Sequence, residues 1–209
     1  MAALDLDCLA RDFADYELEL SRAQLEQVQT YLRLLLRWNE RVNLTGLRDP
    51  RRIVRELFCE SIYLTRITLL TGKLLDIGSG AGFPGLALKV AAPHLAVVLL
   101  EPSHRKCAFL KEAVRTLQLS DVLVVDQRLA DYSLSCEGLF EVATTRAVAI
   151  GNRFVRDVRS MLEAGGKFVV FSSRGLVGRV VHVNGGFYWA EPRPIPHTHG
   201  RMIVLGVAK

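Results

Sequence analysis

The segment LLDIGSGAGFPG, residues 74–85, constrains the fold of this chain more than any other feature. An apolar run leads into Gly78, Gly80 and Gly82, and Pro84 then opens a helical pattern. Glycine at such a turn permits positive φ angles and lets a ligand approach the backbone closely. We therefore predict a strand, a tight turn and a helix, with a ligand held at the turn rather than a turn that binds nothing.

Strand and helix patterns alternate beyond this segment. Such alternation favours a parallel, doubly wound sheet. The last two apolar segments, residues 180–189 and 201–208, have no helical pattern between them and predict a closing antiparallel hairpin. This order predicts the α/β class, with a mostly parallel, seven-stranded, Rossmann-like sheet. By fold analogy alone, it is the element order of the class I S-adenosylmethionine-dependent methyltransferase type. The earlier strand patterns cover residues 73–78, 95–101, 121–125, 140–145 and 167–171, and the helix patterns cover residues 84–92, 103–117 and 154–166.

Residues 1–70 have a different texture and predict a helical extension that packs on the core. Ser21 and Gln24 form a capping box ahead of an apolar stripe at helical spacing. Asp49 as N-cap and Pro50 as the first helical residue open another helix. We predict an N-terminal extension over residues 1–70 and a methyltransferase domain over residues 71–209, together one structural unit.

The glycine segment admits two kinds of ligand. Gly80, Gly82 and Gly85 satisfy the GxGxxG pattern of dinucleotide-binding folds, which is a weak signal by itself. Asp76, at the end of the strand, favours S-adenosylmethionine instead, because a carboxylate there can hold the ammonium group of that ligand. Phe83 favours the same ligand, since its bulk would crowd a pyrophosphate at the helix N-terminus. We predict S-adenosylmethionine as the cofactor, with a nicotinamide dinucleotide as the alternative.

Glu101 ends the second predicted strand, roughly 20 residues beyond the glycines, where nucleotide-binding folds keep a carboxylate for ribose hydroxyls. Both cofactors require that contact, so Glu101 does not separate them; the alternative is an exposed acid ahead of Pro102. An NAD-dependent oxidoreductase would also need a His/Lys or Ser/Tyr/Lys catalytic set, and the sequence has no convincing one.

The charge balance favours an anionic partner. The chain has 27 Lys and Arg against 22 Asp and Glu, and most of the basic residues are arginine, whose guanidinium matches phosphate oxygens well. A compositional bias of the genome is the alternative. The first 20 residues lack the pattern of a secretory signal, the apolar runs are too short to span a membrane, and the four cysteines are scattered. We predict a cytoplasmic monomer with reduced thiols that does not bind a membrane.

Two arginine sets are candidates for RNA contact, although either can be an ordinary solvated helix face. Trp38 and Asn39 are candidates for reaching a splayed base, but Trp38 also continues the apolar stripe, which favours core packing. His197 and His199 have no evident third partner, so we predict no metal site. The arginine sets are Arg48, Arg51, Arg52 and Arg55 at the start of one helix, and Arg153, Arg156 and Arg159 at intervals of three residues on another.

Four segments together resemble the ribosomal RNA small subunit methyltransferase G family, the 16S rRNA guanine-N7 methyltransferases also called the glucose-inhibited division protein B family. They are WNERVNLTGLRDP, LLDIGSGAGFPGLAL, LLEPSHRKCAFLKE and TTRAVA, and the resemblance extends from about residue 21 to residue 166. It implies a cytoplasmic enzyme that moves a methyl group from S-adenosylmethionine to N7 of one guanine in 16S ribosomal RNA, either free or within the small ribosomal subunit.

By position, the resemblance implies cofactor contacts at Gly78, at Phe83, at the backbone of Leu129 and Ala130, and at Arg146. The chain departs from the family pattern in two places. The family commonly has a glutamate where this chain has Ala130. Many members also have Lys-Gly after the fifth strand and a longer segment before the final hairpin, where this chain has FSSRGLVG and a short tail.

Guanine N7 has an in-plane lone pair and no proton to lose, so the implied reaction needs no general base and depends on alignment. The sequence agrees, because it lacks the Asn/Asp-Pro-Pro-aromatic motif of amine methylation after the fourth strand and a cysteine in the setting of cytosine-C5 chemistry. Arg146 has three interpretations: it binds the donor's carboxylate, it holds RNA, or it forms a salt bridge with Glu141 or Asp157. A methyltransferase for another RNA or a small molecule, and a non-catalytic RNA-binding module, are the remaining alternatives.

Overall fold

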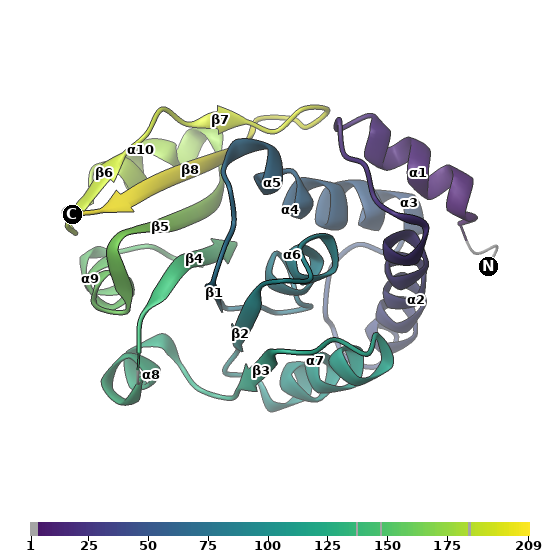
Figure 1. Cartoon of the computed structure of the whole chain (residues 1–209), viewed down its shortest axis with the longest axis horizontal. Helices are drawn as coiled ribbons and strands as arrows, with labels where there is room; N and C mark the ends of the chain where they lie inside the picture. Colours follow the sequence, from purple (N-terminus) through teal and green to yellow (C-terminus); the bar gives the residue numbers. More distant parts are fainter. Residues whose placement is uncertain (1–3, 137, 147, 184) are drawn as a thin grey trace.

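The structure is a computed structural model that describes residues 4–136, 138–146, 148–183 and 185–209. In this part of the chain, an eight-stranded mixed sheet has the order β3-β2-β1-β4-β5-β8-β6, with β7 paired to β8 (Figure 1). Strands β1 to β5 pair in parallel, and β8 is antiparallel to β5. The strands are β1 (Lys73–Ile77), β2 (Ala96–Leu100), β3 (Val122–Val125), β4 (Phe140–Arg146), β5 (Leu162–Ser173), β6 (Phe187–Trp189), β7 (Arg193–Pro194) and β8 (Arg201–Ala208).

The sheet confirms the predicted α/β class and the antiparallel terminal strands, with three differences of detail. The two-residue strand β7 was not predicted; it shares the outer edge of β8 with β6, because β5 occupies the other edge. Strand β5 begins at Leu162, so helix α9 (Asn152–Ser160) is shorter than the predicted helix 154–166. Helix α10 (Val177–Val181) enters the segment predicted to be free of helix.

Helices cover both faces of the sheet, and two hydrophobic clusters fill the space beneath them. Side chains of a strand alternate between faces, and β1 shows this directly. Leu74 belongs to the cluster under α2, α6 and α7, whereas Leu75 and Ile77 belong to the cluster under α9 and α10. The helices after β1 are α6 (Gly85–Ala91), α7 (His104–Thr116), α8 (Leu129–Ser135) and α9, then the 3-10 turn η2 (Arg174–Leu176) and α10.

The N-terminal extension is helical, as predicted. Ser21 and Gln24 form the predicted capping box. The backbone amide of Gln24 donates to Ser21 Oγ at 3.3 Å, and the backbone amide of Ser21 donates to Gln24 Oε1 at 2.8 Å. Asp49 caps the helix that Pro50 opens. Directly after that helix the chain makes a π-helical turn, which no sequence signal predicted. The elements are α1 (Leu6–Ala14), α2 (Arg22–Asn39), α3 (Pro50–Ile53), the π-helical turn η1 (Val54–Cys59), α4 (Glu60–Ile62) and α5 (Leu64–Ile67).

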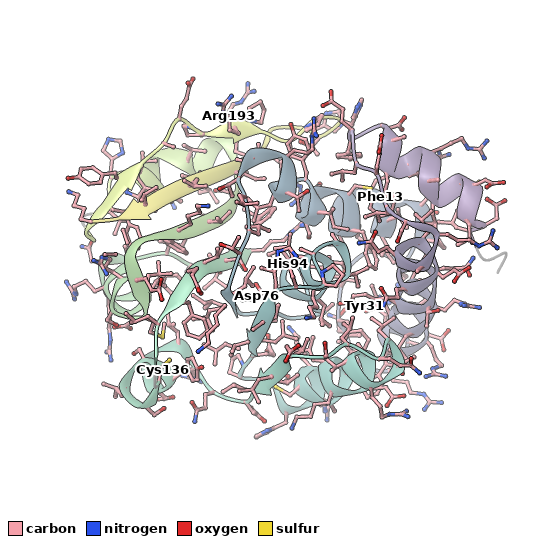
Figure 2. All side chains as sticks on the ribbon, in the orientation of Figure 1. Phe13, Tyr31, Asp76, His94, Cys136 and Arg193 are labelled. Carbon is pink, nitrogen blue, oxygen red and sulfur yellow. The ribbon has the colours of Figure 1, made fainter. Side chains whose placement is uncertain are left out.

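An aromatic cluster joins the extension to the glycine turn. Tyr31 of α2 stacks on Phe83 with the ring centroids 5.4 Å apart, and Phe58 of η1 packs edge-on against both rings. The Tyr31 hydroxyl also donates a hydrogen bond of 2.5 Å to the carbonyl oxygen of Ala81, inside the glycine turn. Figure 2 labels Tyr31 among the side chains of the whole molecule. The extension therefore supports the glycine turn through Tyr31. None of the helices in the described residues combines the length and the hydropathy needed to cross a membrane.

Candidate functional site

The glycine turn between β1 and α6 has the backbone geometry that its sequence predicted. Gly78, Gly80 and Gly82 have φ angles of +71°, +58° and +85°, in the region that favours glycine. The Gly78 amide donates to the carbonyl oxygen of Leu100 at 2.8 Å, which fixes the turn to the end of β2. A Cβ atom on Gly78 would lie 2.8 Å from Cγ2 of Val148, so an added side chain would force Val148 to move.

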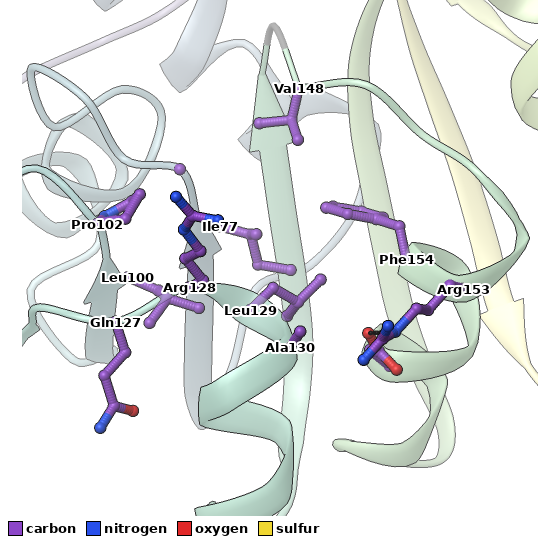
Figure 3. Close-up of a pocket in the computed structure, with 12 residues that line it drawn as sticks. Ile77, Leu100, Pro102, Gln127, Arg128, Leu129, Ala130, Val148, Arg153 and Phe154 are labelled. Atoms are coloured by element: carbon purple, nitrogen blue, oxygen red, sulfur yellow. Dashed lines mark ion pairs between the residues drawn. The ribbon is translucent and has the colours of Figure 1, made fainter.

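A cavity of about 400 Å³, here called the first cavity, opens at the carboxyl ends of β1, β2, β3 and β4 (Figure 3). The strand order reverses between β1 and β4, and ligands of open α/β sheets bind at this reversal. Phe154 from α9 and Ile77 from β1 point into the space between them. The described lining residues are Ile77, Gly78, Leu100, Pro102, Gln127, Arg128, Leu129, Ala130, Val148, Arg153, Phe154 and Asp157.

Three of the predicted cofactor residues line the first cavity: Gly78, Leu129 and Ala130. Leu129 and Ala130 are the first two residues of α8, the helix that follows β3. Sequence reasoning missed most of the other lining residues, among them Pro102 and Phe154. These residues lie just after the end of a strand or at the start of a helix. Such a position predicts a lining residue only when the order of the strands in the sheet is known.

Asp76 does not line the first cavity, contrary to the prediction that its carboxylate faces the ligand. It is 1% exposed, and its two oxygens accept hydrogen bonds from the Gly85 amide at 3.0 Å and from Thr144 Oγ1 at 2.9 Å. Burial raises the pKa of Asp76 to about 6, although these hydrogen bonds oppose the shift. The carboxylate therefore holds the turn, the start of α6 and β4 together.

Glu101 lies between two lining residues, Leu100 and Pro102, at the end of β2. Its carboxylate accepts hydrogen bonds from the Gly80 amide at 2.9 Å and from the Ser103 amide at 3.0 Å. It is 5% exposed, so the alternative of an exposed acid is wrong. The contact of Glu101 with ribose hydroxyls stays a prediction.

Phe83 and Gly82 support the turn from its buried side. The Phe83 side chain is 5% exposed, lies in the aromatic cluster with Tyr31 and Phe58, and does not line the first cavity. A Cβ on Gly82 would lie 2.1 Å from the Tyr31 hydroxyl oxygen. The Phe83 ring therefore packs into the core and does not face the first cavity.

Arg146 ends β4, and it lies against the extension instead of the first cavity. Its Nη2 donates to Oε2 of Glu60 at 2.7 Å and to the carbonyl oxygen of Glu56 at 2.6 Å. The proposed partners Glu141 and Asp157 are therefore wrong, and sequence reasoning missed Glu60, which is 1% exposed. Burial lowers the pKa of Arg146 and raises that of Glu60, while their mutual attraction opposes both shifts.

Arg146 lines a second cavity, of about 520 Å³, at the ends of β4 and β5. This second cavity and the first cavity share Val148. The described lining residues of the second cavity are Thr145, Arg146, Val148, Ala149, Ile150, Val170, Phe171, Ser172, Ser173, Leu176, Arg179, Val180 and Arg201.

The first arginine set is largely engaged with acids of the extension. Arg55 donates to Asp12 at 2.8 Å and to Asp15 at 2.7 Å, and Arg51 lies 3.1 Å from Asp12. Arg52 pairs with Glu56 at 2.8 Å, and Arg48 is exposed. Asp12 and Asp15, near the start of the chain, thus neutralise Arg51 and Arg55.

The second set is divided between different environments. Arg153 lines the first cavity, with Nε 3.9 Å from Asp157. Arg159 donates to the backbone carbonyl of Leu162 at 3.2 Å and also to that of Lys209. Arg156 is exposed.

Trp38 and Asn39 have structural partners. Trp38 packs edge-on against Phe109 of α7, with centroids 5.8 Å apart, as the core-packing alternative requires. The Asn39 side chain is bonded to the backbone of the segment that follows α2, at Leu44, Thr45 and Leu47. Its position fixes that segment.

His197 of the β7–β8 connection contacts the extension. Its Nε2 lies 2.9 Å from the carbonyl oxygen of Asp15, and its ring packs against Tyr16. Within the described residues, no group of three or more His, Cys, Asp and Glu side chains is placed to hold a metal ion.

Comparison with known proteins identifies a family. A family model described as "rRNA small subunit methyltransferase G" matches residues 24–175. The chain is 38% identical over 196 residues to the ribosomal RNA small subunit methyltransferase G of Chloroflexus aggregans, covering 89% of this chain and 82% of that protein. It is 36% identical over 213 residues to the protein of the same name from Roseiflexus castenholzii, covering 96% and 90%.

Solved structures agree on the fold. A crystal structure of a SAM-dependent methyltransferase from Aquifex aeolicus superposes with a TM-score of 0.62 at 16% identity, covering 80% of this chain and 97% of that one. At this identity the likeness shows the fold alone, whereas the family match and the relatives' names show the enzyme class. The chain is an S-adenosylmethionine-dependent methyltransferase and belongs to the rRNA small subunit methyltransferase G family.

Proposed function

We propose that this enzyme binds S-adenosylmethionine in the first cavity and methylates N7 of one guanine in 16S ribosomal RNA, either free or in the small ribosomal subunit. The observation that carries the proposal is the first cavity itself, which lies at the strand-order reversal and is bordered by the glycine turn. The names of the relatives, which specify the RNA of the small ribosomal subunit, support the substrate class.

The residues present fit this cofactor. The volume of the first cavity is in the range of small-ligand sites, and Gly78 lines it without a side chain, so its backbone borders the cavity directly. Gly78 and the backbone of Leu129 and Ala130 would hold the cofactor, with Glu101 at the ribose. Ala130 cannot supply the carboxylate that the family commonly has there, so its contribution is a backbone contact. When bound, S-adenosylmethionine supplies an electrophilic methyl group on a positively charged sulfur.

The side chains around the two cavities suit methylation at a ring nitrogen. Among the described lining residues of both cavities, none is cysteine or histidine, and Asp157 is the one carboxylate, beside Arg153. Methylation of guanine N7 removes no proton and forms no enzyme adduct, so such groups are unnecessary. Rate acceleration then comes from aligning the nucleophile with the methyl group, which contributes on the order of 7–11 kcal/mol in favourable cases.

RNA contact falls to the arginines of the two sets, and we propose that their contributions are unequal. Arg48 and Arg156 are exposed, and no ion pair or hydrogen bond of their side chains is found in the described residues. Arg51, Arg52 and Arg55 must exchange an existing acid partner for a phosphate. We expect Arg48 and Arg156 to dominate the salt dependence of RNA binding, because counterion release scales with newly formed phosphate contacts.

Borohydride–aniline cleavage of 16S RNA tests the reaction directly. RNA from cells that contain the protein should be cut at one guanine that remains intact in RNA from cells that lack it. An unchanged cleavage pattern would reject guanine-N7 activity in favour of another RNA or a small molecule. Calorimetry with S-adenosylmethionine, with its demethylated product and with a nicotinamide dinucleotide tests the cofactor separately; heat from the nicotinamide dinucleotide alone would reject the methyl donor.

A further inference from the structure

The second cavity has the charge and the position of a site for a nucleotide. It adjoins the first cavity at Val148, and three of its lining residues, Arg146, Arg179 and Arg201, are arginines. None of its described lining residues is acidic. Arg146 and Arg201 share the single carboxylate of Glu60 behind the wall. No ion pair of Arg179 is found in the described residues, so a ligand there meets hydrogen-bond donors and net positive charge. A nucleotide combines base-edge acceptors with anionic phosphates, which is the chemistry these side chains recognise.

The guanidinium of Arg146 is buried but only partly satisfied. Its Nη2 has two acceptors, the Glu60 carboxylate and the Glu56 carbonyl oxygen. Its Nη1 is the one buried side-chain nitrogen or oxygen atom among the described residues that has no hydrogen-bond partner. Buried polar groups are nearly always paired, and an unpaired donor costs about 1–3 kcal/mol, so an acceptor is expected to arrive with a ligand.

Glu60 determines where Arg146 lies. One carboxylate oxygen of Glu60 contacts Nη2 of Arg146, and the other lies 3.4 Å from Nε of Arg201. The carboxylate therefore holds together two guanidinium groups that would repel each other. Glu60 directly follows the π-helical turn η1, and turns of this kind occur frequently at functional sites.

We propose that Glu60 is a positioning residue for target recognition, which holds Arg146 in the wall of the second cavity, and that this cavity receives the target guanine. The inference rests on the proposed function. Guanine presents O6 and N7 on the edge that arginine binds. N7 must keep its lone pair free for the methyl group, so O6 is the acceptor for Nη1. Arg179 and Arg201 then face the phosphates that flank the base.

Kinetics of Glu60 variants test the positioning role. Glu60→Gln keeps the shape of the side chain and removes the charge that orients both arginines. With unmethylated 16S RNA as substrate, kcat/KM should fall roughly tenfold or more, while the Kd of S-adenosylmethionine stays at the wild-type value. Glu60→Asp retains the charge and should recover part of the loss. Glu112→Gln, which removes a carboxylate from an ion pair with Arg115 on α7, is the matched control and should keep wild-type kinetics.

A base analogue tests the contact with O6. In 16S RNA assembled so that the mapped guanine alone is 2,6-diaminopurine, N7 is present and an amino group replaces O6. Wild-type enzyme should use this RNA roughly tenfold less well than normal RNA, and Glu60→Gln should discriminate less between the two.

Three results would overturn the inference: normal kinetics in Glu60→Gln, loss of donor affinity in parallel with activity, or undiminished discrimination. If Glu60→Gln melts below the assay temperature, Glu60→Asp decides by the same discrimination measurement. Wild-type enzyme that methylates no guanine N7 would reject the proposed function itself.

Discussion

Asp76 shows how a single buried charge can shape a binding turn from outside the first cavity. Its carboxylate accepts one hydrogen bond from the start of α6 and one from Thr144 of β4, so it ties together three elements that meet beneath the turn. The cost is visible in the pKa of Asp76, which burial raises to about 6. Burial of the Asp76 carboxylate therefore lowers the stability of the folded protein near neutral pH, while its hydrogen bonds fix the geometry of the turn.

The pKa of Asp76 predicts an unusual pH dependence of stability. The folded-state pKa is about 6 against an ordinary value of 3.8, so the folded state binds the proton more tightly than the unfolded state between these values. This group's contribution must therefore rise as the pH falls through 6 and level off near 4. The rise amounts to roughly 3 kcal/mol at most.

Asp76→Asn removes this titration. Urea unfolding between pH 4.5 and 7 should show the stability of the wild type, relative to Asp76→Asn, increasing as the pH is lowered. Asp7→Asn changes an exposed carboxylate of α1 and serves as the control. Parallel stability curves for the wild type and Asp76→Asn would contradict the assignment.

Gly78 makes a second prediction at this scale. Alanine at its φ of +71° costs about 1–2 kcal/mol, and the added Cβ would lie 2.8 Å from Val148 at the edge of the first cavity. Gly78→Ala should lower the melting temperature by a few degrees and weaken S-adenosylmethionine binding roughly tenfold in calorimetry. Gly46→Ala has open space around the new methyl group and is the control. Unchanged affinity in Gly78→Ala would remove the turn from the binding site.

At the scale of elements, the contact between helix α2 and the glycine turn matters most. The Tyr31 hydroxyl satisfies the Ala81 carbonyl, and the Tyr31 ring stacks on Phe83 two residues later. Two hydrogen bonds thus hold the glycine turn: the Gly80 amide donates to the carboxylate of Glu101, and the Tyr31 hydroxyl of the extension donates to the Ala81 carbonyl. Donor binding should depend on a residue that lies in the first third of the chain and outside the first cavity.

Tyr31→Phe separates the hydrogen bond from the stacking. It leaves the Ala81 carbonyl unpaired, so unfolding free energy should fall by about 1–3 kcal/mol. Calorimetry should also show donor affinity reduced several-fold, since the turn loses a constraint. Tyr63→Phe removes the hydroxyl of a half-buried tyrosine, for which no hydrogen bond is found in the described residues, and it should change neither quantity. A loss of stability without any loss of affinity would show that the turn is rigid without Tyr31.

Local signals account for what the sequence could predict at this scale. The caps at Ser21 and Asp49, the glycine turn and most strands depend on neighbouring residues, and they were confirmed. Glu60 and Arg146 lie 86 positions apart in the chain, and neither has a local pattern that reports their contact. The same holds for Asp76, whose burial depends on how β4 and α6 pack around it.

At the scale of the whole molecule, one hydrophobic cluster crosses the predicted boundary at residue 70. It contains side chains of the extension, such as Leu35 and Phe58, together with Leu74 and Leu99 of the sheet. The second cluster fills the opposite face of the same strands. We propose that the extension and the sheet fold as one cooperative unit, because neither can expose its side of the shared cluster to water.

The two tryptophans report on this cooperativity from opposite faces. Trp38 packs against the first cluster and Trp189 against the second. In urea, Trp38→Phe and Trp189→Phe should each show one fluorescence transition that coincides with loss of far-ultraviolet circular dichroism. An early transition of the Trp38 signal would mean that the extension unfolds by itself.

The π-helical turn η1 has a consequence for how this chain can vary. A π-helical turn accommodates one residue more than an α-helix would over the same backbone path, and each residue rotates a helix by about 100°. Removing one residue between Pro50 and Glu60 would therefore swing the Glu60 carboxylate away from both arginines, even if every side chain were kept. Along this stretch, the number of residues therefore determines the position of Glu60 as much as their identity does.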